Sequence, residues 1–403
     1  MNRRGARIDV AVVGGGVVGA ACALGLALRG LEVALVEAAK PPRWSADARD
    51  LRVYAFAADN AVLLEDLDVW ANVRDARVQP YRRMRVWDAA GGGELAFDAD
   101  QLGRRELGWI VEHGLLANRL WQALPQAGVQ LHCPARLQGC RQDADGVCLE
   151  LDDGSRIDAR LVVAADGADS ALRGLLDIGV DARDYRQRGL VCFVDSERPH
   201  QDTAWQRFLP GGPLALLPFA DDPLADTERL GRSSSIVWSL PEDDAARMLA
   251  LDEDAFGEAL TRASDRRLGS LRTTSPRVAF PLRRQLAQAC VRGRVVLVGD
   301  AAHVVHPLAG QGVNLGLRDV SSLRRMVDDA TARRADFAAA QRLQRWARER
   351  RSENAMAAHA FEAINRAFSS DAVGATLLRG PLLGLAGRMP PLVRAFWRHA
   401  AGV

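Results

Sequence analysis

The sequence lacks several features that would each point to a particular class of protein. Lys40 is the only lysine among 403 residues, and the formal net charge of +2 leaves no overall electrostatic case for binding a nucleic acid. The six cysteines include no C-x-x-C pair and no metal-ligand spacing, which predicts free thiols in a reducing compartment, here the cytoplasm. No internal repeat of solenoid or propeller period is present. With 48% hydrophobic and 26% charged residues, the composition is that of an ordinary globular protein.

A long uncharged run near the N-terminus is interrupted by glycines. Residues 10–28 carry no charge and follow three arginines, an arrangement that superficially resembles a signal peptide or a membrane span. Five glycines within the run, and a second apolar stretch behind it, fit a buried β-α-β unit better. We therefore expect a strand at residues 8–13, a helix at residues 17–28 and a second strand at residues 32–37.

A glycine motif lies between the first expected strand and the first expected helix. Gly14-x-Gly16-x-x-Gly19 permits a tight turn, close approach of a pyrophosphate and close packing of helix on strand. The phosphates would meet the positive end of the helix. Glu37, at the end of the second strand, can accept hydrogen bonds from ribose hydroxyls, and an acid there disfavours a 2′-phosphate. The motif therefore predicts an FAD or NAD site.

Two later strand-like runs end in the same pair of residues, in opposite order. Residues 161–165 lead into Asp166-Gly167, and residues 295–298 lead into Gly299-Asp300. The segment between them, residues 181–280, alternates short apolar runs with polar turns, which is typical of a sheet-rich insertion. After residue 317, charged and apolar residues interleave at helical spacing.

The predicted fold class is α/β, with a Rossmann-like FAD-binding domain, an inserted sheet-rich substrate domain and a helical C-terminal region. The expected FAD-binding domain is discontinuous and comprises residues 1–77, 105–180 and 281–350. The substrate domain is expected at residues 78–104 and 181–280, and the helical region at residues 351–403.

Several longer stretches resemble the flavoprotein aromatic hydroxylases with the para-hydroxybenzoate hydroxylase fold. Within them, the chain is most similar to the ubiquinone-biosynthesis hydroxylases of the UbiH/UbiF/VisC type. The stretches that carry the resemblance are residues 50–53, 109–112, 165–173, 299–319 and 350–354 and a tail with Arg388 and Pro390-Pro391. His113 departs from the family pattern, which has asparagine after the glutamate.

The resemblance implies FAD as the cofactor and assigns it a set of binding residues. The ADP part would lie on Gly14, Gly16, Gly19 and Glu37, the pyrophosphate by Arg52, and the ribityl chain on Asp300 beside Gly299. Asp166 and Gly167 would shape the groove and the approach of the nicotinamide donor. The residues that would lie along the isoalloxazine ring are Pro307, Gly310, Gln311, Gly312, Val313 and Asn314. Independently of the family, a glycine-rich loop entering a helix can present N–H groups to a reduced, anionic flavin.

The reaction expected from this resemblance is a monooxygenation. NAD(P)H would reduce the flavin as a transient donor, O2 would add at flavin C4a, and the hydroperoxide would hydroxylate the ring of a polyprenylated phenol or quinol intermediate of ubiquinone synthesis. Two alternatives stay open: a soluble phenol hydroxylase of aromatic catabolism, and a non-catalytic flavoprotein of a biosynthetic complex. A flavin-dependent halogenase would need an active-site lysine, for which Lys40 is badly placed.

Neither the histidines nor the C-terminal tail yields a firm assignment. His303 and His306 have no third ligand nearby, so no metal site is expected, and we name no catalytic base. Residues 377–401 mix arginines with large apolar residues, which suits a helix on an anionic membrane or one packed on the core. Peripheral association with the inner membrane or with a biosynthetic complex is left open by this pattern.

Overall fold

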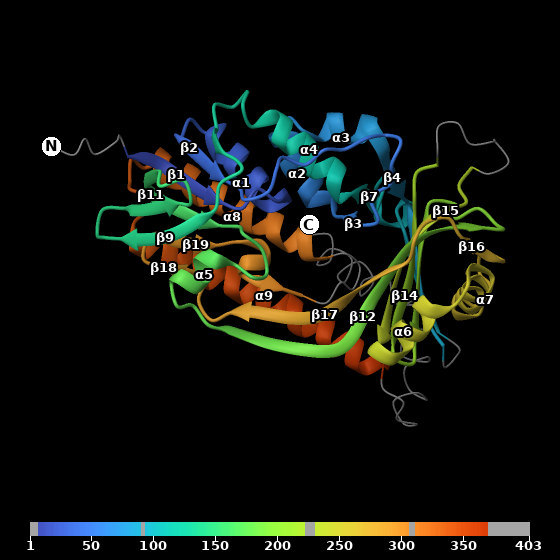
Figure 1. The fold of residues 1–403 in the computed structure, drawn as a ribbon. Coiled ribbons are helices and arrows are strands. Elements are labelled where there is room, and N and C mark those ends of the chain that lie inside the picture. The colour runs from blue at the N-terminus through green and yellow to red at the C-terminus, as the bar shows by residue number, and fades with distance from the viewer. Residues whose placement is uncertain (1–6, 90–92, 222–229, 306–310, 370–403) are drawn as a thin grey trace.

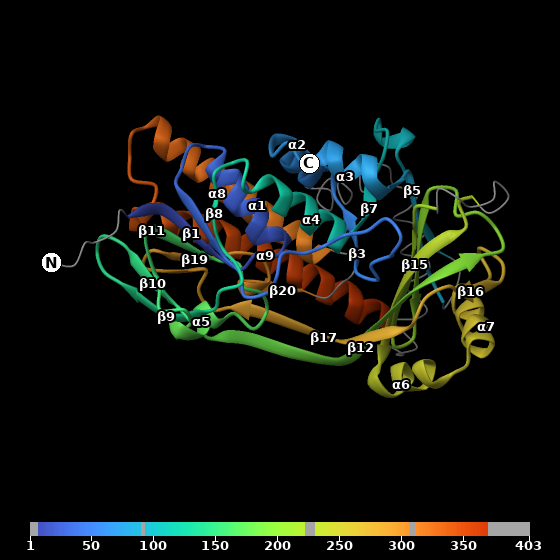
Figure 2. The same cartoon turned by 45° about the horizontal axis from the view of Figure 1, so that its top comes forward.

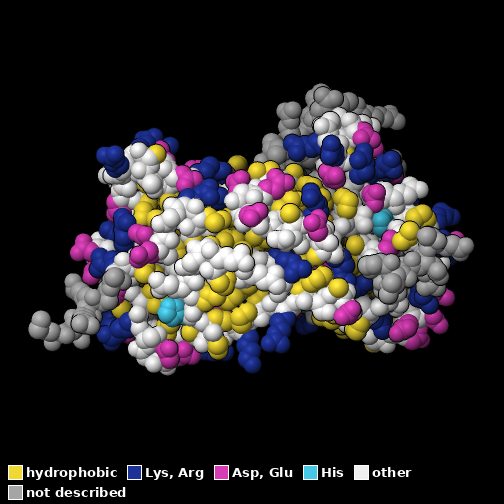
Figure 3. All heavy atoms as spheres, turned by 90° about the horizontal axis from the view of Figure 1, so that it is seen from above, with side chains coloured by type: hydrophobic (Ala, Val, Ile, Leu, Met, Phe, Trp, Pro, Cys, Tyr) yellow, Lys and Arg dark blue, Asp and Glu magenta, His cyan; other side chains and the backbone are white. Residues whose placement is uncertain are grey.

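The computed structural model describes residues 7–89, 93–221, 230–305 and 311–369. Figure 1 shows two bodies side by side, a layered α/β body and a second body dominated by strands, with two long strands running from one into the other. Charged side chains of both signs are interspersed over the face seen in Figure 3, with hydrophobic side chains between them. Within the described ranges, no helix is both long and apolar enough to cross a bilayer.

The first body is built on an eight-stranded sheet whose inner strands are parallel. β1 lies between β11 and β2, and the pairs β1–β11, β1–β2, β2–β8 and β11–β19 are parallel. The strand order is β18 (Val291–Arg292), β19 (Val295–Leu297), β11 (Arg156–Ala164), β1 (Ile8–Val13), β2 (Val33–Val36) and β8 (Gln130–His132), with β10 (Val147–Leu151) on β11 and β9 (Leu137–Gln142) on β10.

The predicted β-α-β unit is present, and its helix is buried on nearly every side. α1 (Val17–Ala27) packs between α4 (His113–Ala123) and α8 (Gln311–Ala332), so the apolar run between residues 10 and 28 is explained by two-sided packing. The remaining helices of this body are α2 (Ala58–Asp66), α3 (Trp70–Arg77), α5 (Ala171–Leu175) and α9 (Ala340–Ser369). α9 packs against α8 and runs from there towards the second body (Figure 2).

The second body is a nine-stranded, mostly antiparallel sheet that carries a hydrophobic core of its own. Its order is β20 (His303–Val304), β17 (Val278–Ala287), β12 (Val180–Ser196), β15 (Ser233–Pro241), β14 (Gly212–Pro218), β13 (Thr203–Leu209), β5 (Arg83–Asp88) and β6 (Glu94–Asp98), with β16 (Leu271–Thr273) on β12. Two helices that the strand pattern did not predict, α6 (Glu242–Ala250) and α7 (Glu253–Ala263), cover this sheet. The α/β class with an inserted sheet is thereby confirmed.

A small antiparallel sheet and two long strands join the bodies. β3 (Val53–Phe56), β7 (Gly108–Glu112) and β4 (Val78–Tyr81) form the small sheet, and its apolar residues pack with Phe193 and Phe219 of the large one. β12 and β17 pair along most of their length and reach the turn after β19 through β20. The two bodies are therefore connected both by the small sheet and by the two long strands.

Candidate active site

The three motif glycines meet different surroundings in the turn between β1 and α1. Gly14 has φ +102°, and a Cβ on it would lie 2.3 Å from the carbonyl oxygen of Ala165. A Cβ on Gly19 would lie 1.9 Å from the carbonyl oxygen of Gly14. Around Gly16, in contrast, a Cβ would meet no atom within 4 Å. The fold itself thus requires the first and third glycines, while the second leaves a space at the helix N-terminus that suits a pyrophosphate.

Glu37 holds the same turn from the end of β2. Its carboxylate accepts hydrogen bonds from the backbone N–H of Gly15 at 2.5 Å and of Ala39 at 2.7 Å. The indole N–H of Trp121 on α4 donates to the carbonyl oxygen of Gly15 at 2.6 Å. Trp121 is a residue that motif reading missed, because nothing in its sequence neighbourhood links it to a loop 106 residues away.

Asp166 and Gly167 form the turn after β11, where Gly167 has φ +85°. The Asp166 carboxylate accepts hydrogen bonds from the Ser170 hydroxyl at 2.5 Å and the Leu172 N–H at 3.0 Å, so it orders the start of α5. Arg173, which is buried, donates to the carbonyl oxygen of Ala301 at 3.0 Å. This bond ties the turn after β11 to the turn after β19.

The Gly299-Asp300 turn is anchored by a buried polar cluster centred on Asp319 of α8. The Asp319 carboxylate accepts hydrogen bonds from the Gly299 N–H at 3.0 Å, from Arg350 Nε at 2.8 Å and from Asn354 Nδ2 at 3.2 Å. His303 Nε2 lies 2.6 Å from the same carboxylate. Although burial acts to raise it, the neighbouring His303, Arg350 and Gly299 N–H together lower the pKa of Asp319 to about 2.

This cluster, defined here as the Asp319 cluster (Asp319, His303, Arg350 and Asn354), was not predicted as a unit. One sequence signal could have found it, because Asp319 falls between buried apolar residues on α8 and an aspartate there needs cationic partners. His303, considered above as a metal ligand, belongs to this cluster instead. Among the described residues, no group of histidine, cysteine, aspartate or glutamate could hold a metal ion.

Asn314 fastens the first turns of α8 to the small sheet. Its side-chain oxygen accepts hydrogen bonds from the Ala57 N–H at 3.0 Å and from Asn60 Nδ2 at 2.9 Å, and its Nδ2 donates to the Ala55 carbonyl at 2.8 Å. The residue is completely buried and does not line the cavity described below. Its side chain therefore fixes the position of α8 relative to β3.

The loop that carries Arg52 is held by a second buried carboxylate, Glu112. This residue accepts hydrogen bonds from the Asp50 N–H at 2.7 Å, from Trp44 Nε1 at 3.1 Å and from Arg77 Nε at 2.9 Å. The Asp50 carboxylate in turn accepts the Gly114 N–H at 2.8 Å, at the start of α4. The backbone leading to Arg52 is thus fixed at several points.

Arg49 attaches the same loop to the large sheet. Its Nη1 donates to the Ser233 hydroxyl at 2.9 Å, and its guanidinium lies 5.6 Å and 5.5 Å from the ring centroids of Phe193 and Phe219. Cations over aromatic faces are attracted by the ring quadrupole. The loop before β3 therefore belongs to the contact between the two bodies.

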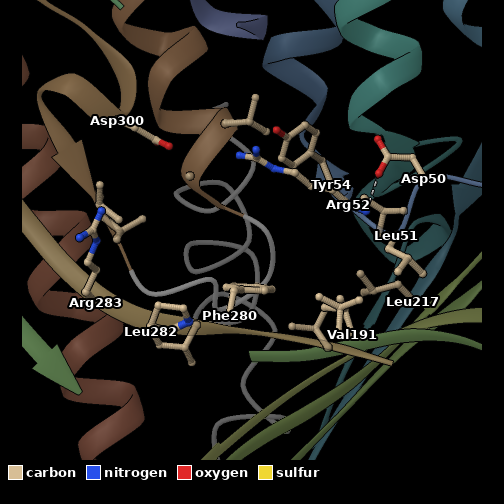
Figure 4. A pocket seen from close by; sticks show the side chains of 18 residues that line it. Asp50, Leu51, Arg52, Tyr54, Val191, Leu217, Phe280, Leu282, Arg283 and Asp300 are labelled. Carbon is tan, nitrogen blue, oxygen red and sulfur yellow. Dashed lines mark hydrogen bonds between the residues drawn. The ribbon is translucent and has the colours of Figure 1, made fainter. Parts of the chain in front are cut away.

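A cavity of about 520 Å³ opens between the bodies, and part of the predicted site lines it. Figure 4 shows Arg52, Tyr54 and Asp300 on one side of this space and Leu217, Val191 and Phe280 on the other. Most of the lining residues are apolar, namely Leu51, Val53, Val191, Leu217, Val237, Val278, Phe280, Pro281, Leu282, Val304, Val305 and Val313. The polar lining residues are Asp50, Arg52, Tyr54, Arg283 and Asp300, and Gly312 at the start of α8 also lines the cavity.

The predicted cofactor residues thus fall into groups. Four of them share the cavity, namely Arg52, Asp300, Gly312 and Val313, while the β1–α1 turn with Glu37 and the turn with Asp166 lie outside its lining. Pro307 and Gly310, and also His306, lie outside the described residues, as does the side chain of Gln311. Arg52 and Asp300 are 248 residues apart in the sequence, and the tertiary structure brings both to the same cavity.

Among the residues that line the cavity, Tyr54 contacts His113, the residue that departs from the family pattern. The Tyr54 hydroxyl lies 2.7 Å from His113 Nδ1. Burial raises the pKa of Tyr54 to about 12, whereas burial and the neighbouring Arg52 lower the pKa of His113 to about 4. Both side chains are therefore neutral at neutral pH.

Comparison with known proteins identifies the family. A family model described as FAD binding domain matches residues 7–360. The ubiquinone hydroxylase UbiL of Rhodospirillum rubrum is 36% identical over 396 residues, which cover 98% of this chain and 89% of that protein. The 3-demethoxyubiquinol 3-hydroxylase of Escherichia coli is 36% identical over 400 residues, covering 98% of each.

The solved structures add evidence on the fold. The p-nitrophenol 4-monooxygenase PnpA of Pseudomonas putida superposes with a TM-score of 0.74 over 97% of this chain and 96% of that one, at 19% identity. The full-length matches to relatives at 36% identity confirm the resemblance stated from the motifs. The chain therefore belongs to the FAD-dependent monooxygenases, in the family of the ubiquinone-biosynthesis flavin hydroxylases.

Proposed function

We propose that this monooxygenase hydroxylates the aromatic ring of a polyprenylated phenol or quinol intermediate of ubiquinone biosynthesis, with FAD, NAD(P)H and O2. The two relatives named above are a ubiquinone hydroxylase and a demethoxyubiquinol hydroxylase, which supports the pathway. The observation that carries the proposal is the largely apolar lining of the cavity, in which Arg52, Tyr54 and Asp300 lie across the space from Leu217, Val191 and Phe280 (Figure 4).

The distribution of polarity in the cavity suits such a substrate. A ring hydroxyl needs a hydrogen-bonding partner once it leaves water, and the lining residues Arg52, Arg283 and Asp300 carry polar groups of this kind. A prenyl chain gains about 25 cal/mol for each Å² of apolar surface removed from water, and the strands β12, β14 and β17 offer Val191, Leu217 and Phe280 for that contact. A small, fully polar aromatic acid would leave this wall unused.

The surroundings of the glycine turn fit the diphosphate of FAD. The open space at Gly16 lies at the N-terminus of an 11-residue helix, where N–H groups without intrahelical partners favour an anion. Glu37 would accept hydrogen bonds from the ribose, Arg52 would pair with the diphosphate, and Asp300 would accept hydrogen bonds from the ribityl hydroxyls. When bound, FAD supplies the redox chemistry that activates O2.

The residues of the chain then have positioning and shielding roles. Gly312 and Val313 lie in the first turn of α8, and their N–H groups would stabilise negative charge on the isoalloxazine ring of the bound flavin. The apolar lining residues would exclude water from the reacting centre. The sequence holds one G-x-G-x-x-G turn of this kind, so we expect NAD(P)H to bind transiently rather than on a domain of its own.

The function is tested by complementation of bacterial strains that each lack one ubiquinone ring hydroxylase, with accumulated quinone intermediates read by mass spectrometry. Rescue of one strain is expected, and the intermediate that disappears identifies the ring position. Asp300→Ala is expected to weaken FAD binding and to abolish the rescue while leaving the protein folded. Wild-type flavin content in this variant would contradict the role of Asp300.

Failure in every strain, with the protein expressed and yellow, would overturn the ubiquinone assignment and favour a phenol hydroxylase of aromatic catabolism. Reduction by NAD(P)H and substrate-dependent O2 uptake exclude a non-catalytic flavoprotein. A peripheral place at the inner membrane stays a prediction, because residues 377–401 lie outside the described residues. Flotation of the full chain with anionic liposomes tests it.

A further inference from the structure

We propose that a groove between α8 and α9 is a binding site for a ligand that carries a phosphate monoester. The groove has a volume of about 510 Å³ and shares no lining residue with the cavity between the two bodies. It lies where the last turns of α8 meet the first turns of α9, at the end of the first body that is away from the second (Figure 2). The inference is therefore independent of the proposed function.

The two helices bring charged residues to the groove from both sides. These residues are spaced by three or four positions along the chain, a spacing that places them on one face of each helix. They are Arg325, Asp329 and Arg333 from the α8 side and Arg342, Arg345 and Glu349 from the α9 side. The ends of two helices thus gather the charges in one place.

Positive charge is in excess in the groove. Four arginines and two acidic residues line it. Asp329 serves two of the arginines, because its carboxylate lies 2.8 Å from Arg333 Nε and accepts a hydrogen bond from Arg342 Nη1 at 3.0 Å. Among the described residues, no carboxylate pairs with Arg325 or Arg345. These two side chains are exposed, so both guanidinium groups are available to an anion.

A buried donor without a partner lies at the same groove. Trp346 lines the groove although it is only 3% exposed, and its Nε1 has no hydrogen-bond acceptor within the part of the chain that the structure describes. A buried indole N–H usually has an acceptor, and the lack of one costs free energy. The ring packs in the core of the first body, so its N–H is left for a group that enters the groove.

These donors suit a phosphate monoester better than a carboxylate. An arginine presents paired N–H groups that match two oxygens of a phosphate, and a monoester carries close to two negative charges at neutral pH, which balances two arginines. A carboxylate would balance only one. The volume exceeds that of a phosphate group, so the groove also has room for the alcohol part of the ester. The ester can come from a soluble metabolite or from a phospholipid headgroup.

Three substitutions test the site and one serves as a control. Arg325→Gln and Arg345→Gln each remove a cation that has no ion pair, so the fold should tolerate both. Trp346→Phe keeps an aromatic ring and removes the N–H. The control is Arg348→Gln, because Arg348 is an exposed arginine of α9 that does not line the groove.

The soluble source is tested by calorimetric titration of the holoenzyme with glycerol 3-phosphate, in a buffer without phosphate. Bound FAD occupies the proposed diphosphate position at Gly16, so the probe cannot bind there. Binding to the wild type and to Arg348→Gln should be equal, whereas Arg325→Gln and Arg345→Gln should bind at least about tenfold more weakly and Trp346→Phe about fivefold more weakly. Flavin content and substrate-dependent O2 uptake should be unchanged in all four variants.

The lipid source is tested by flotation with vesicles of phosphatidylcholine, with and without phosphatidic acid, whose headgroup is the same monoester. Loss of binding to the acidic vesicles in Arg325→Gln and Arg345→Gln, with no binding of glycerol 3-phosphate, would assign the site to a phospholipid. If neither probe binds, or if the groove variants bind both probes as the wild type does, the site is overturned. Equal binding of the preferred probe by the wild type and Trp346→Phe would overturn the role of the indole.

Discussion

At the scale of single residues, the glycines of the first turn serve two separate requirements. Gly14 and Gly19 are required by the chain itself, because a Cβ on either would overlap backbone atoms. Gly16 has φ −64° and open space around it, so the fold accepts a larger residue there. The motif therefore joins a folding requirement and a binding requirement in six residues.

This difference predicts opposite behaviour for two alanine variants. Gly16→Ala should change the free energy of unfolding of the FAD-free protein by at most about 1 kcal/mol, because only the helix N-cap is altered. Its FAD affinity should fall about tenfold or more, or by about 1.4 kcal/mol. Gly14→Ala should instead prevent stable folding. Urea unfolding and flavin titration measure both quantities, and full FAD affinity in Gly16→Ala would contradict the proposed diphosphate position.

At the scale of elements, α8 connects the cofactor turn, the small sheet and α9. Its first turns are fixed to β3 by Asn314, and its middle is fixed to α9 and to the Gly299 turn by the Asp319 cluster. An aspartate on an otherwise buried helix face is costly unless it is fully paired. The cluster meets that condition, and its position next to Asp300 means that helix packing also determines the shape of the proposed ribityl site.

Removing the charge at the centre of this cluster should lower the free energy of unfolding. Asp319→Asn leaves Arg350 buried beside a neutral group, which costs about 3 kcal/mol or more in unfolding free energy. Asp329→Asn, on the same helix but at an exposed ion pair with Arg333, should cost less than about 1 kcal/mol. Denaturant unfolding checks the comparison. Equal stability of the two variants would show that the cluster contributes nothing beyond a surface pair.

At the scale of the whole molecule, the cavity depends on two bodies with separate cores. One core surrounds the parallel sheet and α8, the other fills the space between the large sheet and α6 and α7, and a smaller cluster with Phe193 and Phe219 lies between them. Arg49 and the long strands β12 and β17 span the same boundary. The relative placement of the bodies is therefore fixed by several separate contacts rather than by one shared core.

Acid should destabilise the molecule in two stages. The folded state lowers the pKa of His113 from 6.5 to about 4, so the unfolded chain binds the proton first and stability falls as pH drops through that range. For Asp319 the folded pKa of about 2 lies below the ordinary 3.8, so its contribution is lost as pH falls towards 2. Burial also lowers the pKa of His200, so His113→Asn should reduce the upper stage without removing it and should leave the lower stage unchanged. Urea midpoints measured across pH test this, and an unchanged profile would contradict it.

The sequence by itself determined the local units and the family. Strand, turn, helix and strand at residues 8–37 could be predicted because glycine geometry and apolar patterning act between near neighbours, and the structure has β1, α1 and β2 within one residue of the predicted bounds at each end. The Gly299–Asp319 block identified the flavin hydroxylases for a similar reason, since its residues lie together in the chain.

Only the tertiary structure decided which distant polar groups meet. Asp319 with Arg350, Glu112 with Arg77, and Tyr54 with His113 are pairs of common residues whose spacing carries no periodic signal. Patterning encodes which face of an element is buried, but the partner of a buried polar group depends on how elements pack, because hydrogen bonds act only over about 3 Å. The cavity between the two bodies follows from that packing.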